Sequence, residues 1–155
     1  MMQVFTAPEN YVKPLKVFLG GTIDGGDSPD WQQEVIDILN KASKTPAIVF
    51  NPRRKEFDKN APSELVQEQI DWEQRHLDEA DIIIMNILPD SKSPISLLEL
   101  GLYAQTGKLK VFCSPDFYRY ENIKMTCNKY KVDIFPFNGS LEIASVITQL
   151  DRNKL

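Results

Sequence analysis

The sequence has few of the residues on which metal centres and thiol- or histidine-dependent catalysis rely. It contains two cysteines, Cys113 and Cys127, and one histidine, His76. Two cysteines do not make a disulfide framework for a chain of 155 residues. One histidine supplies neither a zinc cluster nor an obvious Ser-His or Cys-His pair. We therefore expect no metal and no cofactor, and chemistry that depends on carboxylates, hydroxyls, amides and arginines.

Long apolar segments and an excess of positive charge are also missing. Residues 1–14 contain no apolar signal core, and no segment approaches the roughly 20 apolar residues that span a bilayer. The net charge is −4, whereas proteins that bind nucleic acid polymers usually carry a basic surface. The tight basic group Arg53-Arg54-Lys55 suits one small anion better than a polymer. The sequence thus predicts a cytoplasmic protein with reduced thiols that binds neither membranes nor nucleic acid polymers.

What the sequence does contain is an alternation of short apolar segments with amphipathic ones. We interpret residues 1–155 as a single domain, with residues 1–14 as an N-terminal arm. Alternating strands and helices predict an α/β fold: one doubly wound, Rossmann-like or flavodoxin-like five-stranded parallel sheet with helices on both faces. The expected strands cover residues 15–19, 47–50, 81–88, 110–113 and 132–137, and the expected helices cover 31–42, 63–80, 94–107 and 141–150.

Particular residues predict where the helices begin and end. Ser28 and Ser93 each precede a proline, the combination expected of a helix cap followed by the first helical position. Ser63 is a candidate cap of the second helix, and Gly107 a candidate C-cap of the third. Residues 114–130 are rich in aromatic side chains and show no clear strand or helix period.

Four polar loops follow the predicted strands, and they contain GGTIDGG, NPRRKEF, PDSKSPIS and SPDFYRYEN. In open parallel sheets, ligands bind beyond the carboxyl ends of the strands, where the strand order reverses. The sequence therefore predicts a ligand site at the edge of the sheet where these loops meet.

One glutamate, Glu99, stands in an unusually apolar helix, SPISLLELGLYAQTGK. A helix that is apolar on most of its circumference is expected to be buried, and a buried carboxylate needs a partner or a raised pKa. Ser96 and Glu99 also match a capping box, in which Glu99 would only bond the first amides of the helix. Because Ser93-Pro94 is a better helix start, we favour a functional reason for Glu99.

A second glutamate, Glu73, lies in the apolar stripe of the preceding helix. The stripe has the spacing +4, +3, +4, +3 that lines one helix face, which predicts that Glu73 points toward the sheet. Asp71 falls on another face, where charge is expected. The stripe consists of Val66, Ile70, Glu73, Leu77 and Ala80.

Two carboxylates flanking one buried strand suit glycosidic chemistry. Carboxylates in different environments let one site hold a nucleophile and an acid at neutral pH. A retaining glycosidase forms a covalent sugar intermediate on such a nucleophile. With no catalytic histidine or metal ligands in view, the sequence favours glycosyl transfer.

Several segments strongly resemble the nucleoside 2-deoxyribosyltransferase-like family. They run from about Val17 to Tyr130 and comprise GGTIDGG followed by DWQ, NPRR, QEQIDWEQRHLDEADIII and SPISLLELGLYAQTGK. ELGLYAQTGK resembles the family's nucleophile helix, whose glutamate corresponds to Glu99. The family's second acid is usually an aspartate eight residues before the aspartate that opens the next strand. Counting back from Asp81 gives Glu73, and Asp71 stays an alternative.

The resemblance implies that Glu99 attacks C1′ of a 2′-deoxynucleoside and that the sugar then passes to another base. Glu73 would position Glu99 or protonate the leaving base. The related deoxynucleoside 5′-monophosphate N-hydrolases, which share the glycine loop and the Glu-Leu-Gly helix, imply an alternative reaction with water as acceptor. A nucleotide-binding module without catalysis is the third alternative.

Further residues are expected to bind the substrate. Ser93 lies where the monophosphate hydrolases have a serine that contacts phosphate, and its other reading is the helix cap. The family also forms oligomers in which a neighbouring chain completes the sugar pocket. We therefore expect a homodimer or a larger closed ring, with Asn122 reaching Glu99 of a second copy or of its own chain. The expected substrate-binding residues are Gly21, Thr22, Ile23, Asp24, Asn51, Arg53, Ser93 and Asn122.

Overall fold

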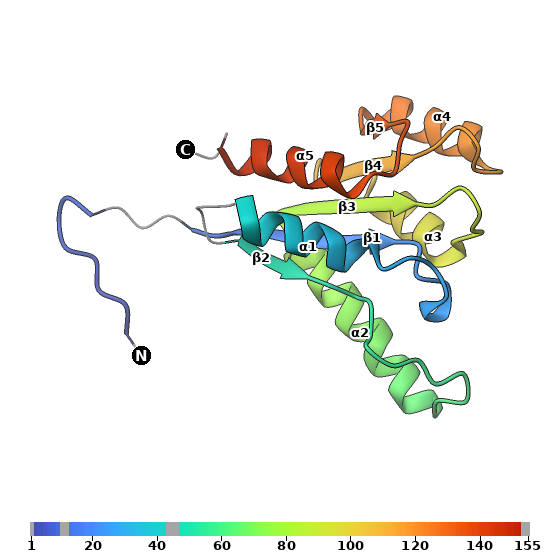
Figure 1. Cartoon of the computed structure of the whole chain (residues 1–155), viewed down its shortest axis with the longest axis horizontal. Helices are drawn as coiled ribbons and strands as arrows, with labels where there is room; N and C mark the ends of the chain where they lie inside the picture. Colours follow the sequence, from blue (N-terminus) through green and yellow to red (C-terminus); the bar gives the residue numbers. More distant parts are fainter. Residues whose placement is uncertain (1, 10–12, 43–46, 153–155) are drawn as a thin grey trace.

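A computed structural model describes residues 2–9, 13–42 and 47–152 of the chain. Its centre is a sheet of five parallel strands in the order β2-β1-β3-β4-β5 (Figure 1). The predicted doubly wound α/β fold is confirmed, and the strand order reverses at β1, which lies between β2 and β3. The strands are β1 (Leu15–Gly21), β2 (Ala47–Phe50), β3 (Ile82–Ile87), β4 (Leu109–Cys113) and β5 (Asp133–Phe135).

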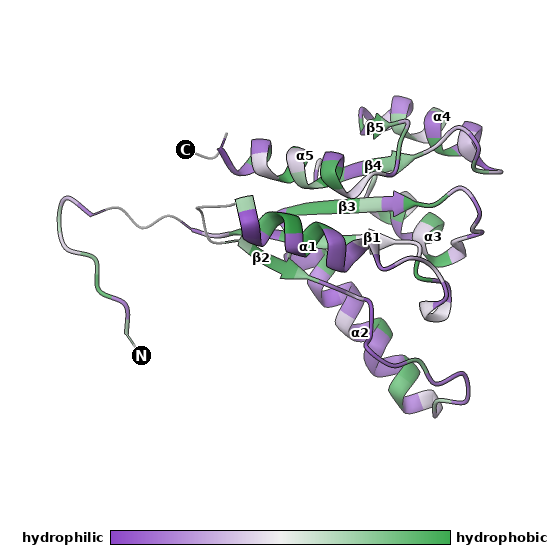
Figure 2. Cartoon of the chain, in the orientation of Figure 1, coloured by the Kyte–Doolittle hydropathy of each residue, from purple (hydrophilic) through white to green (hydrophobic). Residues whose placement is uncertain are grey.

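Helices cover both faces of the sheet (Figure 1). Helices α1 (Trp31–Ala42) and α5 (Ser140–Arg152) pack against one face, and α2 (Ser63–Glu79), α3 (Pro94–Tyr103) and α4 (Tyr120–Tyr130) against the other. The central strand β3 is buried along its whole length and is almost entirely hydrophobic in Figure 2. This is expected of a parallel strand covered on both faces.

The N-terminal arm predicted over residues 1–14 is described only in part, since residues 1 and 10–12 lie outside the described ranges. Residues 2–9 are exposed and form neither helix nor strand. Among the described helices, none has both the length and the apolar character needed to cross a membrane.

Three of the predicted helix caps are wrong, although helix α1 has the predicted bounds. Helix α1 begins at Trp31, and Asp30 caps it, since Asp30 Oδ1 accepts a hydrogen bond from the Gln33 amide at 3.1 Å. Helix α2 has Pro62 at its N-cap position. Helix α3 ends at Tyr103, so Gly107 lies in the turn beyond it with a left-handed φ of 78°. The cap positions are therefore Asp30, Pro62 and Ala104 in place of the predicted Ser28, Ser63 and Gly107, and of these Asp30 makes a side-chain capping hydrogen bond.

Residues 114–130, for which the sequence predicted neither helix nor strand, contain helix α4. Its buried side is formed by Tyr120, Ile123, Cys127 and Tyr130, whose spacing of +3, +4, +3 is helical. A tyrosine at each end and a cysteine in the middle concealed this pattern, because none of them is a typical core aliphatic residue.

Two helices are less buried than predicted. On α3, Ile95, Leu98 and Leu102 are 58%, 59% and 62% exposed, so α3 is not a buried helix. On α2, only the end of the predicted stripe faces the sheet: Leu77 and Ala80 are buried, whereas Val66 and Ile70 are exposed. The N-terminal half of α2 extends past the sheet, as Figure 1 shows, so the sheet cannot cover it.

Candidate functional site

The candidate site lies beside β1 and β3, at the point where the strand order reverses. Gly21 ends β1 against Asn86 of β3 and has a φ of 134°. A Cβ atom at Gly21 would lie 2.0 Å from the Asn86 carbonyl oxygen, so only glycine fits. The next residue, Thr22, donates its backbone N–H to the same oxygen at 2.9 Å. This contact fixes where the loop after β1 departs from the sheet.

Glu73 of α2 and Glu99 of α3 line one cavity of about 400 Å³. The structure therefore brings together the two glutamates that sequence reasoning singled out from separate helices. Glu99 is in the second turn of α3, and Ser96 lies inside the helix, so the capping-box interpretation is wrong. Three apolar residues, Ile70, Leu98 and Leu102, are also among the residues that line this cavity.

Burial and mutual repulsion govern the charges of the two carboxyl groups. Burial raises the pKa of Glu99 to about 7, and the negative charge of Glu73 adds to this rise. Burial also raises the pKa of Glu73, whereas a hydrogen bond from Gln69 and the positive charge of Arg54 act against that rise. The two carboxyl groups therefore titrate as a coupled pair, in which ionisation of Glu73 disfavours ionisation of Glu99.

Asp71, the alternative second acid, lies on a different face of α2. Its carboxylate is exposed and pairs with Arg75 at 3.0 Å. Glu73 is partly buried and lines the same cavity as Glu99, which favours Glu73 over Asp71 as the second acid.

Arg53 is directed at the loop that follows β1. Its side chain is 8% exposed, and its Nε lies 3.6 Å from Asp30 Oδ1. Its Nη1 donates to Ser28 Oγ at 3.3 Å and to Pro29 O at 3.1 Å, and its Nη2 donates to Gly26 O at 3.1 Å and to Ser28 O at 2.5 Å. The four N–H donors of the two terminal nitrogens therefore have acceptors within this loop.

Asn51 has a similar local role at the end of β2. Its Oδ1 accepts the Arg53 amide at 3.0 Å, which folds the Asn-Pro-Arg turn. Asn51 and Arg53, predicted as substrate ligands, thus hold the walls of the site through these contacts.

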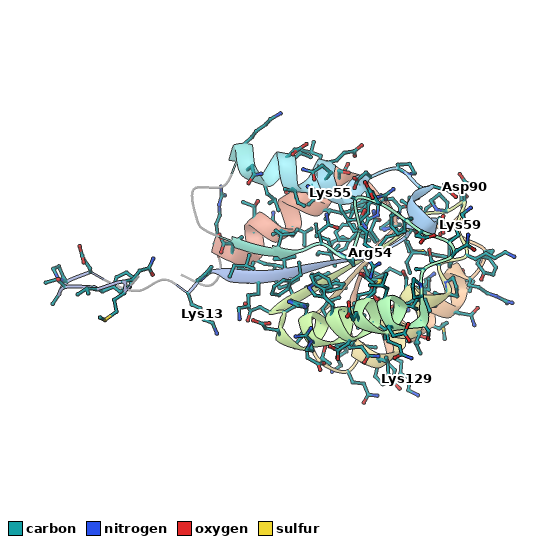
Figure 3. All side chains as sticks on the ribbon, turned by 90° about the horizontal axis from the view of Figure 1, so that it is seen from below. Lys13, Arg54, Lys55, Lys59, Asp90 and Lys129 are labelled. Atoms are coloured by element: carbon teal, nitrogen blue, oxygen red, sulfur yellow. The ribbon has the colours of Figure 1, made fainter. Side chains whose placement is uncertain are left out.

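Arg54, which the sequence offered only as part of a basic group, and Gln69, which sequence reasoning missed, both line a second cavity of about 290 Å³ that also includes Glu73. Ile23 of the glycine-rich loop, a predicted ligand, also lines it. Gln69 lies four residues before Glu73 on α2, a spacing that places the two side chains side by side on a helix. This spacing could have identified Gln69 from the sequence. Figure 3 shows Arg54 beside α2.

Ser93 belongs to a buried cluster of three hydroxyl groups. Its Oγ lies 2.7 Å from Thr22 Oγ1 and 2.7 Å from Ser91 Oγ. Thr22 Oγ1 also accepts the Leu88 amide at 2.9 Å, and Ser91 Oγ donates to Leu88 O at 2.8 Å. Ser93 occupies the N-cap position of α3, yet its side chain makes no capping hydrogen bond. A cavity of about 210 Å³ beside it is lined by Gly21, Ile23, Asp24, Ser93, Pro94, Ile95 and Ser96.

Asn122 lies on the opposite flank of α3 from Glu99. It lines a separate cavity of about 330 Å³ with Leu97, Arg119 and Thr126. The structure therefore does not bring Asn122 together with Glu99 of its own chain. In the described part of the chain, no three histidine, cysteine or acidic side chains gather in a way that could hold a metal ion.

A protein-family model for nucleoside 2-deoxyribosyltransferase-like proteins matches residues 14–117. The chain belongs to this family. The matched region includes β1, both glutamates and the glycine-rich loop. Family membership relates the chain to deoxyribosyltransferases, and it assigns neither a substrate nor a reaction.

A solved structure shares the fold. A conserved protein from Enterococcus faecalis V583 superposes with a TM-score of 0.61 at 11% sequence identity, covering 88% of this chain and 99% of that chain. No curated protein matches the sequence.

Proposed function

We infer that this chain is an enzyme that cleaves the N-glycosidic bond of 2′-deoxynucleosides and transfers the deoxyribosyl group to another base. The observation that carries this proposal is the cavity shared by Glu73 and Glu99, in which burial and repulsion separate the proton affinities of two carboxyl groups. One carboxylate is then available as a nucleophile and the other as an acid. The cavity lies in a chain that belongs to the nucleoside 2-deoxyribosyltransferase-like family.

In the proposed first step, an oxygen of Glu99 bonds to C1′ as the bond from C1′ to the base nitrogen breaks. The bonding electron pair goes to the base nitrogen, which takes a proton from Glu73, the group that must carry the proton once substrate is bound. In the second step, an acceptor base attacks C1′, its proton returns to Glu73, and Glu99 leaves as a carboxylate. A covalent intermediate divides one difficult displacement into two easier ones. The negative charge of the site also stabilises the oxocarbenium-like transition states.

Three observations favour a nucleoside over a nucleoside monophosphate. The hydroxyl groups of Thr22, Ser91 and Ser93 have hydrogen-bond partners within the cluster or at Leu88, so a phosphate would compete with these bonds for Ser93. The donors of Arg53 are occupied by the loop after β1. In addition, Asp24 places a carboxylate in the cavity beside Ser93, where it would repel an anion.

We expect kcat/KM to be higher for 2′-deoxynucleosides than for their 5′-monophosphates by roughly tenfold, since repulsion of about 1 kcal/mol or more acts between phosphate and a nearby carboxylate. Ser93→Ala should change both values by the same factor. Incubation with each substrate, with and without a free acceptor base, and chromatography of the bases give the rates. The incubation without an acceptor base measures hydrolysis. A preference for monophosphates that Ser93→Ala diminishes would contradict the nucleoside assignment.

We further propose that the enzyme is a cytoplasmic homo-oligomer. The two cysteines are free and buried, as suits a reducing compartment. Helices α2 and α3 expose several large apolar side chains, three of which, Ile70, Leu98 and Leu102, line the cavity of the glutamates. Exposed apolar surface of this kind usually marks an interface. Since Asn122 lies on the other flank of α3 from Glu99, a second copy packed on α3 is the way for it to reach a glutamate. The exposed apolar residues are Leu65, Val66, Ile70, Ile95, Leu98 and Leu102.

Light scattering at micromolar concentration should give the mass of a dimer or of a larger closed ring. Leu98→Asp is expected to shift the mass to that of a monomer, because it places a charge in the middle of the apolar face. Leu141→Asp is the matched control, since Leu141 is similarly exposed on α5, on the other side of the sheet. A monomeric wild-type protein with full activity would exclude a shared site.

A further inference from the structure

The side-chain amide of Gln69 bridges Arg54 and Glu73. Its Oε1 accepts a hydrogen bond from Arg54 Nε, and its Nε2 donates to Glu73 Oε1 at 2.7 Å. Nε2 also donates to the Pro52 carbonyl oxygen at 3.3 Å. A guanidinium group only donates hydrogen bonds and a carboxylate only accepts them. The two partners therefore leave the amide a single sensible orientation, with its oxygen toward Arg54 and its nitrogen toward Glu73.

The bridge lies at the junction of two cavities. Arg54, Gln69 and Glu73 line the cavity of about 290 Å³, and Glu73 and Ile70 also line the cavity that contains Glu99. Arg54 is held against α2 by a second bond, from Nη2 to the Leu65 carbonyl oxygen at 3.3 Å. The arginine thus supports the amide from the end opposite to Glu73.

The two glutamates differ in what surrounds them. Glu73 has the Gln69 donor and the Arg54 charge, and both lower its pKa against the effect of burial. For Glu99, burial and the charge of Glu73 act in the same direction, and no described residue forms a hydrogen bond or ion pair with its carboxylate. The other charged or titratable groups lining the two cavities are Asp58 from the loop before α2, Asp78 on α2 and Tyr103 on α3.

We propose that Arg54 and Gln69 are positioning residues that decide which of the two glutamates holds their shared proton, keeping Glu73 ionised and leaving the proton on Glu99 in the free enzyme. A base that enters the cavity of about 290 Å³ competes for the Gln69 amide. Loss of that donor moves the proton from Glu99 to Glu73. The proposed nucleophile is then ionised and the proposed acid is protonated, both in response to the substrate. This catalytic consequence depends on the proposed function, whereas the proton's position does not.

The position of the proton can be measured in the free protein by NMR of glutamate labelled at the side-chain carboxyl carbon, titrated with pH. Spectra of Glu73→Gln and Glu99→Gln assign the two signals. In the wild type, Glu73 should titrate at lower pH than Glu99. In Gln69→Leu, we expect the midpoint of Glu73 to rise by about one pH unit, as loss of a hydrogen bond to a charged group implies, and the midpoint of Glu99 to fall.

Two further variants make the result specific. Arg54→Met removes the positive charge from an exposed side chain and should shift both midpoints in the same directions as Gln69→Leu. Gln67→Leu is the matched control. Gln67 is exposed on α2 and its Nε2 donates to Ser63 Oγ at 3.5 Å, away from both glutamates, so both midpoints should stay in place. Unchanged midpoints in both Gln69→Leu and Arg54→Met overturn the proposal. A protein that shows the shifts but transfers no sugar refutes the proposed function instead.

Discussion

Replacing Glu99 with glutamine is expected to abolish sugar transfer, with a loss in kcat of roughly 10⁴-fold or more, as is typical when a nucleophile is removed. Glutamine keeps the shape of the side chain and loses the charge that would attack C1′. The release of bases from 2′-deoxynucleosides, followed by chromatography, measures this loss. Near-normal turnover in a folded Glu99→Gln protein would show that the nucleophile lies elsewhere.

The same variant should be more stable than the wild type at alkaline pH, which also serves as the control for folding. The pKa of Glu99 in the folded protein is about 7, above its ordinary value of 4.5. Between these values the folded state binds more protons than the unfolded state, so the free energy of unfolding falls as pH rises and stays low above pH 7. The total loss is at most about 3 kcal/mol. Glu99→Gln removes it, so the difference in Tm should be largest near pH 8 and vanish below pH 4.5.

Glu73→Gln is expected to lower kcat by roughly 10²- to 10⁴-fold, the usual contribution of a general acid. The amide keeps the contact with Gln69 but holds no transferable proton and removes the charge that repels Glu99. The loss should be smaller for substrates whose bases leave readily without protonation. Comparing a good and a poor leaving base in the same assay separates acid catalysis from a general disturbance of the site.

Asp71→Asn is the matched control for Glu73→Gln, two residues away on the same helix. The Asp71 carboxylate is exposed and its pair with Arg75 is a surface ion pair, which contributes little to stability. We therefore expect kcat to stay within about twofold of the wild type. Greater damage from Asp71→Asn than from Glu73→Gln would mean that α2 presents a different face to the cavity.

Sequence patterns predicted the sheet well because its strands are nearly uniform apolar segments. Residues of β3 are buried on both faces, so almost any side chain there must be hydrophobic. The spacing of Glu73 in its stripe and the apolar neighbours of Glu99 marked two carboxyl groups that share a cavity. Helix α4 was missed because aromatic residues and a cysteine take the place of aliphatic ones on its buried side.

The amino-acid sequence by itself determined the order of the elements, the parallel sheet and the two glutamates beside its central strand, since these follow from local periodicity. Tertiary structure alone decided which of two adjacent arginines, Arg53 or Arg54, contacts the residues around the glutamates. Arg53 folds onto the loop after β1 while Arg54 reaches Gln69, although the two are adjacent in sequence. It also decided that α3 exposes Leu98 and that Asn122 lies across the helix from Glu99. Such choices depend on contacts between segments far apart in the chain, which no local pattern records.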